Sequence, residues 1–179
     1  MNLKEKYNKD VIKAMKEKFG YGNNLAVPKI LKVTLNIGIG KAKDDPRAIE
    51  VADNTLSRIT GQKPVVTIAK KSISAFKLRE GMKVGLKVTL RGNKMWDFLS
   101  KLVGISLPRV RDFRGLDVKN IDKQGNLNLG FKEHIMFPEI RPDEVEKIHG
   151  LEVAISTSAK NYEEGLELFS LLGFPFKKD

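Results

Sequence analysis

The sequence predicts an α+β fold: a mostly antiparallel sheet of about five strands with peripheral helices over one side, in a single domain spanning residues 1–179. Segments in which apolar and polar residues alternate with a period of two are interleaved with segments of helical spacing. The chain of 179 residues, 41% of them apolar, is long enough to bury one core. No internal repeat or low-complexity linker divides it.

The first expected element is an amphipathic helix over residues 3–19 that ends at Gly20. Its apolar residues recur at every fourth position, and six lysines surround them. These lysines suit either a solvated face or contact with phosphates, and the pattern leaves both readings open. The apolar positions are Leu3, Tyr7, Val11, Met15 and Phe19.

A half-buried strand is expected after Pro28, where apolar and polar residues alternate. A helix follows, with Asp44 and Asp45 as acidic caps ahead of Pro46 and with Gly61 as its stop. The expected core face of the strand holds Leu31, Val33, Leu35, Ile37 and Ile39, and its polar face holds Lys32, Thr34, Asn36 and Gly38.

Residues 64–70 and 83–91 are two further expected strands, and the second has the cleanest alternation in the chain. A sheet face that carries lysine, arginine, threonine and asparagine with few acids is suited to phosphates and riboses. The basic loop between the strands, residues 71–82, is too long for a tight hairpin, and long loops in compact domains are commonly functional. The alternative is a packed loop whose lysines are merely solvated.

The C-terminal half should add two strands and two helices. Asn93 is expected to cap a helix whose Trp96 belongs to the core rather than to a base-stacking platform. The pattern then gives way to a projecting basic loop over about 104–122. Strands are expected within NLNLGFKEHIMF and LEVAISTS, and Asn161 should cap the last helix.

The charge favours a polyanionic partner. Lysine and arginine number 33 against 22 acids, a net charge of +11. Residues 1–141 hold 29 bases and 14 acids, whereas the remainder holds four bases and eight acids. A field of one sign suits nucleic acid. A membrane surface is disfavoured because no basic amphipathic helix carries bulky aromatic anchors. A solvated basic surface is the remaining alternative.

Composition also limits the chemistry. Cysteine is absent, which excludes disulfides and thiolate metal sites and fits a reducing, cytoplasmic setting. NIGIGKAKDD resembles a phosphate loop but lacks the required glycine at Leu35 and the hydroxyl at Ala42. His134 and His149 stand in different sequence contexts, so no zinc site is expected. The sequence therefore predicts no cofactor, no metal and no catalytic group.

The strand positions that would face RNA carry no aromatic residues, unlike the stacking strand of the RNA-recognition motif. Such a surface would read the backbone shape and the 2′-hydroxyls of folded RNA. DNA is less suitable because no helix has a basic, base-reading face. A phosphate-handling enzyme using residues 38–41 and Asp44 is the alternative from another class.

Four segments have a more specific pattern: LSRITGQKPVVTIAKKSISAFKLREGMKVGLKVTLRG (56–92), VPKILKVTLNIGIGKA (27–42), LPRVRDFRGL (107–116) and FKEHIMFPEI (131–140). They closely resemble the bacterial form of the large-subunit ribosomal protein L-five family, and the similarity covers essentially the whole chain. The block from Thr60 to Ser72 is the most specific, because its order of glycine, glutamine and lysines has no general structural explanation.

The resemblance implies a structural ribosomal protein that attaches 5S rRNA to the central protuberance of the large subunit, beside 23S rRNA. The residues it implies for 5S rRNA are Lys32, Thr34, Asn36, Gln62, Lys63, Thr89 and Arg91. It also implies contact with P-site tRNA through Ser72, Ser74, Phe76, Lys77 and Arg79. A bridge to small-subunit protein S-thirteen, near other proteins of the protuberance, would use Arg109, Arg111, Asp112 and Arg114.

Overall fold

The computed structural model describes the chain except residues 1, 41–45, 142, 144, 146–147 and 178–179. It confirms the expected α+β fold, with a five-stranded sheet in the order β2-β3-β1-β5-β4 and antiparallel neighbours throughout. The strands are β1 Ile30–Gly38, β2 Val65–Ile68, β3 Lys83–Leu90, β4 Leu127–Phe131 and β5 Leu151–Thr157. The predicted caps Asp44 and Asp45 lie outside the described residues.

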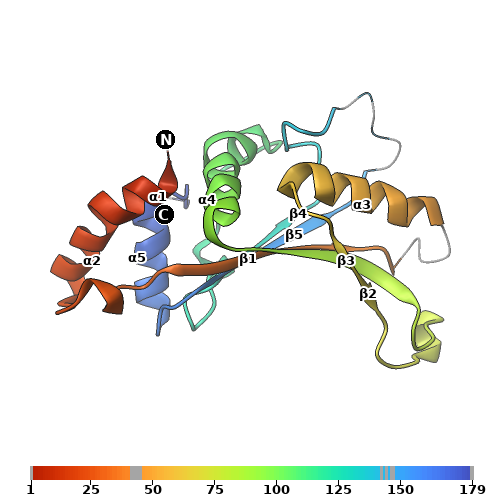
Figure 1. Cartoon of the computed structure of the whole chain (residues 1–179), viewed down its shortest axis with the longest axis horizontal. Helices are drawn as coiled ribbons and strands as arrows, with labels where there is room; N and C mark the ends of the chain where they lie inside the picture. Colours follow the sequence, from red (N-terminus) through yellow and green to blue (C-terminus); the bar gives the residue numbers. More distant parts are fainter. Residues whose placement is uncertain (1, 41–45, 142, 144, 146–147, 178–179) are drawn as a thin grey trace.

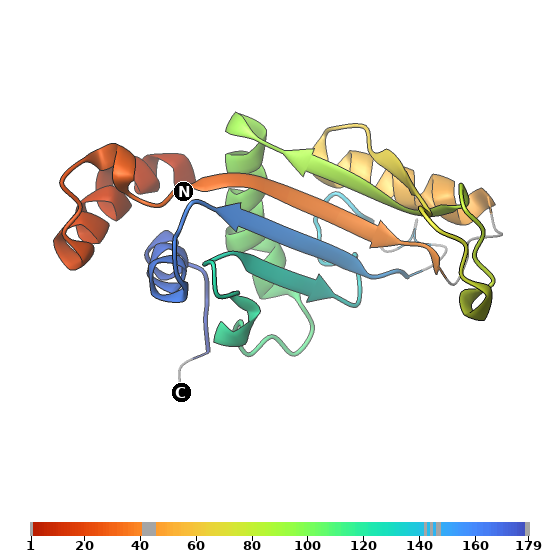
Figure 2. The same cartoon turned by 90° about the horizontal axis from the view of Figure 1, so that it is seen from below.

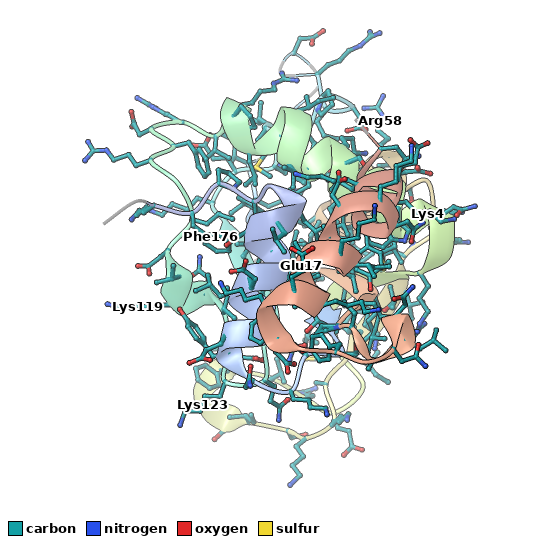
Figure 3. The ribbon with its side chains drawn as sticks, turned by 90° about the vertical axis from the view of Figure 1, so that its left-hand side faces the viewer. Lys4, Glu17, Arg58, Lys119, Lys123 and Phe176 are labelled. Atoms are coloured by element: carbon teal, nitrogen blue, oxygen red, sulfur yellow. The ribbon has the colours of Figure 1, made fainter. Side chains whose placement is uncertain are left out.

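Helices cover one face of the sheet and leave the other open. Helices α3 (Pro46–Thr60) and α4 (Gly92–Lys101) lie across the covered face, and Figure 2 views the sheet from its open side. The N-terminal helices lie beside α5 (Tyr162–Leu172) at one end of the sheet (Figure 3). No helix in the described part of the chain is long and apolar enough to span a bilayer.

The N-terminal helix contains a wide turn that explains its spacing. It consists of α1 (Leu3–Lys6), a π-helical turn at Tyr7–Val11 and α2 (Ile12–Phe19), and it ends at Gly20 with φ 70°. A strict four-residue repeat advances about 40° per step around an ordinary α-helix. The π turn takes up the extra residue, so the apolar positions from Leu3 to Met15 all remain buried.

One strand departs from simple alternation. The register of β1 against β5 shifts between Ile30 and Lys32, which is a β-bulge. Because the bulge adds a residue, Ile30 is buried and Leu31 is 46% exposed, so the prediction that Leu31 faces the core was wrong. Beyond the bulge the alternation holds, and Val33 and Leu35 are fully buried.

The predicted caps had different outcomes. Helix α4 begins at Gly92, and Asn93 does not cap it; its amide oxygen instead accepts a hydrogen bond from Lys4 Nζ at 2.9 Å. The prediction for Asn161 is confirmed, since its Oδ1 accepts from the Glu164 N–H at 2.9 Å. Trp96 lies in the core as predicted, with its ring 5.6 Å from that of Tyr7.

The two histidines, which stand in different sequence contexts, come together in the fold. The rings of His134 and His149 stack with centroids 3.9 Å apart and planes within 7°. The irregular segment after β4 folds back to β5, which brings together two residues 15 positions apart. The described residues contain no group of three potential metal ligands.

Candidate nucleic-acid interface

The strand register aligns polar side chains in rows across the open face. Asn36 on β1 lies opposite Lys87 on β3 and Glu152 on β5. One row further along, Thr34 lies opposite Thr89 and Ala154. The polar residues at the strand positions of this open face are Lys32, Thr34, Asn36, Thr67, Lys83, Lys87, Thr89, Asn128, Glu152 and Ser156. Residues from five strands therefore form a mostly polar surface, to which β2 adds the exposed apolar side chain of Val65 opposite Lys87.

This open face is positively charged. Lys32, Lys83 and Lys87 lie on it, and Glu152 is the one carboxylate among the described strand positions of this face. The amide of Asn36 donates a hydrogen bond to Glu152 Oε2 at 3.1 Å. Arg91, exposed just after β3, adds a further cation at its border. Cations with neutral donors and acceptors between them match the phosphate and ribose groups of a nucleic acid.

A strip without side chains crosses the same face. Gly38 of β1 lies opposite Gly85 of β3. A Cβ atom at Gly85 would lie 2.6 Å from the carbonyl oxygen of Ile37 and 3.1 Å from Thr67 Oγ1, so only glycine fits. Two glycines side by side allow a ligand to approach the sheet backbone closely.

Gln62 and Lys63 precede β2 and differ in their surroundings. The Gln62 amide donates to the carbonyl oxygen of Thr89 at 3.3 Å, so it extends the contact between the chain and β3 beyond the start of β2. Gln62 is half-buried, whereas Lys63 is exposed. The amide group of Gln62 thus already has a structural partner, and Lys63 is available at the border of the open face.

The loop over residues 71–82 projects beyond the end of the sheet, at the right in Figure 2. It is ordered by a bridge between Ile73 and Leu78 and by a 3₁₀ turn at Ser74–Phe76. The Ser72 hydroxyl accepts from the Glu80 N–H at 2.9 Å. Phe76 is 71% exposed, so the loop does not bury its aromatic ring. The five residues predicted to face tRNA, namely Ser72, Ser74, Phe76, Lys77 and Arg79, are all exposed.

The region over 104–122 is held to the body of the protein at several points. Leu107, Leu116 and Ile121 are buried, and the Leu116 N–H donates to the Pro175 carbonyl oxygen at 2.7 Å. An exposed short turn in this region contains Asp112, whose φ of 54° is left-handed. The predicted bridge residues Arg109, Arg111, Asp112 and Arg114 are all exposed on this turn.

The structure adds residues that the sequence did not assign to the site. Alternation alone placed Lys83 and Lys87 on the polar side of their strand, but only the strand order shows that Lys87 lies opposite Asn36. Asn128 and Ser156 join the face because β4 and β5 extend the sheet beyond β1. No local sequence pattern gives the order of strands in a sheet.

The histidine pair, in which His134 is buried and His149 is half-buried, lies beside α3 on the covered side and adds no charge to the open face. His149 Nε2 lies 3.4 Å from Thr55 Oγ1 of α3. Burial, together with the neighbouring His134, lowers the pKa of His149 to about 4. Burial likewise lowers the pKa of His134, so both rings are neutral at neutral pH.

The fold and its open basic face define a class: α+β proteins whose sheet has one face covered by helices and one face that is mostly polar and cationic. Residues 23–79 match the family described as ribosomal protein L5, and residues 83–176 match the model that describes the C-terminus of the same ribosomal family. The chain is 52% identical over 176 residues to the large ribosomal subunit protein uL5 of Halothermothrix orenii, covering 98% of each chain. It is 54% identical over 176 residues to the protein of that name from Dictyoglomus turgidum, again covering 98% of each.

The chain therefore belongs to the ribosomal protein L5 family. It is a structural, non-enzymatic protein of the large ribosomal subunit, as the sequence predicted. Members of this family are cytoplasmic, which agrees with the predicted location.

Proposed function

We propose that the open sheet face binds 5S rRNA and attaches it to the central protuberance of the large subunit. The observation that carries this proposal is the cross-strand alignment of Lys87, Asn36, Thr34 and Thr89 on one face, with Lys32 in line along β1. These side chains offer cations for phosphates and hydroxyl or amide groups for riboses.

The mode of recognition follows from what the face contains. Its described strand positions carry no aromatic ring, so stacking of splayed bases is not how it binds. The Gly38–Gly85 strip lets a sugar–phosphate backbone approach the sheet closely. The face reads the shape and the 2′-hydroxyls of a folded RNA.

Two further contacts belong to the same proposal. The ordered basic loop 71–82 projects past the sheet and reaches P-site tRNA with Lys77 and Arg79, which leaves the open face to 5S rRNA. The exposed turn at 109–114 contacts small-subunit protein S-thirteen and its neighbours in the central protuberance. The remaining basic surface lies against 23S rRNA.

The direct test compares charge losses at two places. Lys32→Gln with Lys87→Gln should weaken binding of isolated 5S rRNA about tenfold or more, because two phosphate contacts are lost. The matched control, Arg111→Gln with Arg114→Gln, removes the same charge from the exposed turn and should bind 5S rRNA almost as the wild type does. Equal losses in the two variants would show that net charge, rather than the open face, determines binding.

A further inference from the structure

The edge strand β4 is only partly covered on its outer side. It pairs with β5 along its whole length, and on the other side a bridge from Ile121 reaches Leu127. The Asp122 N–H also donates to the Asn126 carbonyl oxygen at 2.9 Å. Within the described part of the chain, no backbone hydrogen bond reaches the outer side of residues 128–131. This half of the edge can accept another strand.

A cleft of about 570 Å³ opens beside the uncovered half of this edge. It lies between the end of β4, the turn at residues 109–112 and the segment after β4. Its apolar lining comes from Val110, Phe131, Ile135 and Met136, and its charged lining comes from Arg109, Arg111, Lys132, Asp112 and Glu133. The cleft therefore combines an apolar surface with charges of both signs.

This chemistry differs from that of the open face and fits a protein. The strand positions of the open face set three lysines against one carboxylate, Glu152, whereas the cleft sets two carboxylates beside three cations. Asp112 and Glu133 weaken the attraction of the cleft for phosphates, while an apolar side chain would gain by covering Phe131 and Ile135, which are both half-buried. Two arginines beside an apolar lining suit a carboxylate that neighbours the buried side chain.

We propose that an extended segment of a partner protein adds to the outer edge of β4 as a sixth strand. It places one apolar or aromatic side chain in the cleft and a neighbouring carboxylate on Arg109 and Arg111. Main-chain hydrogen bonds along the edge supply affinity, and the cleft supplies specificity. This inference deepens the proposed function, on which it rests, by specifying how the turn at 109–114 meets its protein partner.

The test uses photo-crosslinking from two positions in the full chain assembled into ribosomes. One variant carries p-benzoylphenylalanine at Glu133, which is exposed and lines the cleft. The other carries it at Lys87, which is exposed on the open face. The Glu133 probe should crosslink to protein, at a segment with an apolar residue and an acidic residue close together. The Lys87 probe should crosslink to rRNA.

A second pair of variants tests the arginines. Adding Arg109→Glu and Arg111→Glu to the Glu133 probe should reduce the protein crosslink at least tenfold, whereas adding Lys119→Glu, exposed but outside both the cleft lining and the turn at 109–114, should leave it unchanged. A crosslink from Glu133 to RNA, or none while Lys87 still reaches rRNA, would overturn the added-strand proposal alone. Failure of Lys87 to reach rRNA would instead contradict the proposed function.

Discussion

At the scale of single residues, the most informative position on the open face is its acid. Glu152 accepts a hydrogen bond from Asn36 at 3.1 Å and places a negative charge among the cations. Glu152→Gln keeps an acceptor for Asn36 but removes the repulsion of phosphates. Two unit charges 4 Å apart in water interact by about 1 kcal/mol, so 5S rRNA should bind several-fold more tightly.

The control for this prediction is Glu163→Gln, which removes an exposed acid from the first turn of α5. Filter binding at moderate salt compares the two variants with the wild type. If Glu152→Gln binds 5S rRNA no better than the control does, the RNA does not lie against this part of the sheet.

The histidine pair predicts an acid-sensitive fold. Burial, and for His149 also the charge on its neighbour, lowers both pKa values in the folded chain, whereas an unfolded histidine titrates near 6.5. Below that pH the unfolded chain binds more protons than the folded chain does. The free energy of unfolding is therefore highest, as far as these two histidines determine it, above about pH 6.5, and it falls as the pH drops toward 4.

After allowance for partial exposure, the loss between pH 7 and pH 4.5 should be about 2 kcal/mol. Urea unfolding at the two pH values measures it. His149→Gln removes the ring with the most strongly lowered pKa and should flatten the dependence, while general acid effects from carboxylates remain the same in both chains. A variant as acid-sensitive as the wild type would mean that the stacked pair is not the cause.

At the scale of elements, the loop 71–82 and the sheet should separate as two RNA-binding surfaces. Lys77→Gln with Arg79→Gln preserves side-chain length, and glutamine meets the same backbone strain as lysine at the left-handed position 77. The variant should bind isolated 5S rRNA almost normally and enter ribosomes. It should hold P-site tRNA less firmly, most visibly at raised salt, where the remaining attraction is screened.

The matched comparison is the sheet-face variant Lys32→Gln with Lys87→Gln, which should show the opposite pattern. Both affinities are measured for both variants in parallel. A large loss of 5S rRNA binding in the loop variant, with tRNA retention unchanged, would make the loop part of the 5S rRNA site.

Elements also show what a sequence can and cannot predict. Alternation along β1, β3 and β5 was enough to place Thr34, Thr89 and Val153 correctly, because a buried face fixes register. It failed at Leu31, where a bulge adds one residue, and at Asn93, whose side chain serves a tertiary contact with Lys4. Such contacts depend on which elements become neighbours, and local spacing carries no information about that.

Gln62 illustrates the same limit within the candidate site. The family resemblance implies an RNA contact for Gln62, and the structure shows that its amide donates to the Thr89 carbonyl oxygen. The sequence shows that a polar residue precedes a strand. It does not show that the backbone carbonyl group of Thr89, on the neighbouring strand, will accept a hydrogen bond from that residue. The family resemblance indicated that the polar face of the sheet is the candidate RNA site, and the strand register showed which side chains lie on that face.

At the scale of the whole molecule, charge is separated between two regions. Two of the C-terminal acids serve structural contacts: Glu167 pairs with Lys18 at 2.6 Å, and Glu164 accepts from the Lys160 N–H at 2.8 Å. These contacts lie around α5, at the end of the sheet beside the N-terminal helices (Figure 1, Figure 3). The open face, where Lys32, Lys83 and Lys87 stand against Glu152, keeps a net positive charge, which favours the approach of a polyanion.

The most direct measurement of the central claim is a salt titration of 5S rRNA binding by the wild type and by Lys32→Gln with Lys87→Gln. If about six phosphates are neutralised, the wild-type slope of log K against log salt should be about −4 to −5. The double variant should have a slope shallower by about 2, because two of those contacts lie on the open face. A wild-type slope near zero, or the same slope in both proteins, would contradict binding of 5S rRNA on the open face.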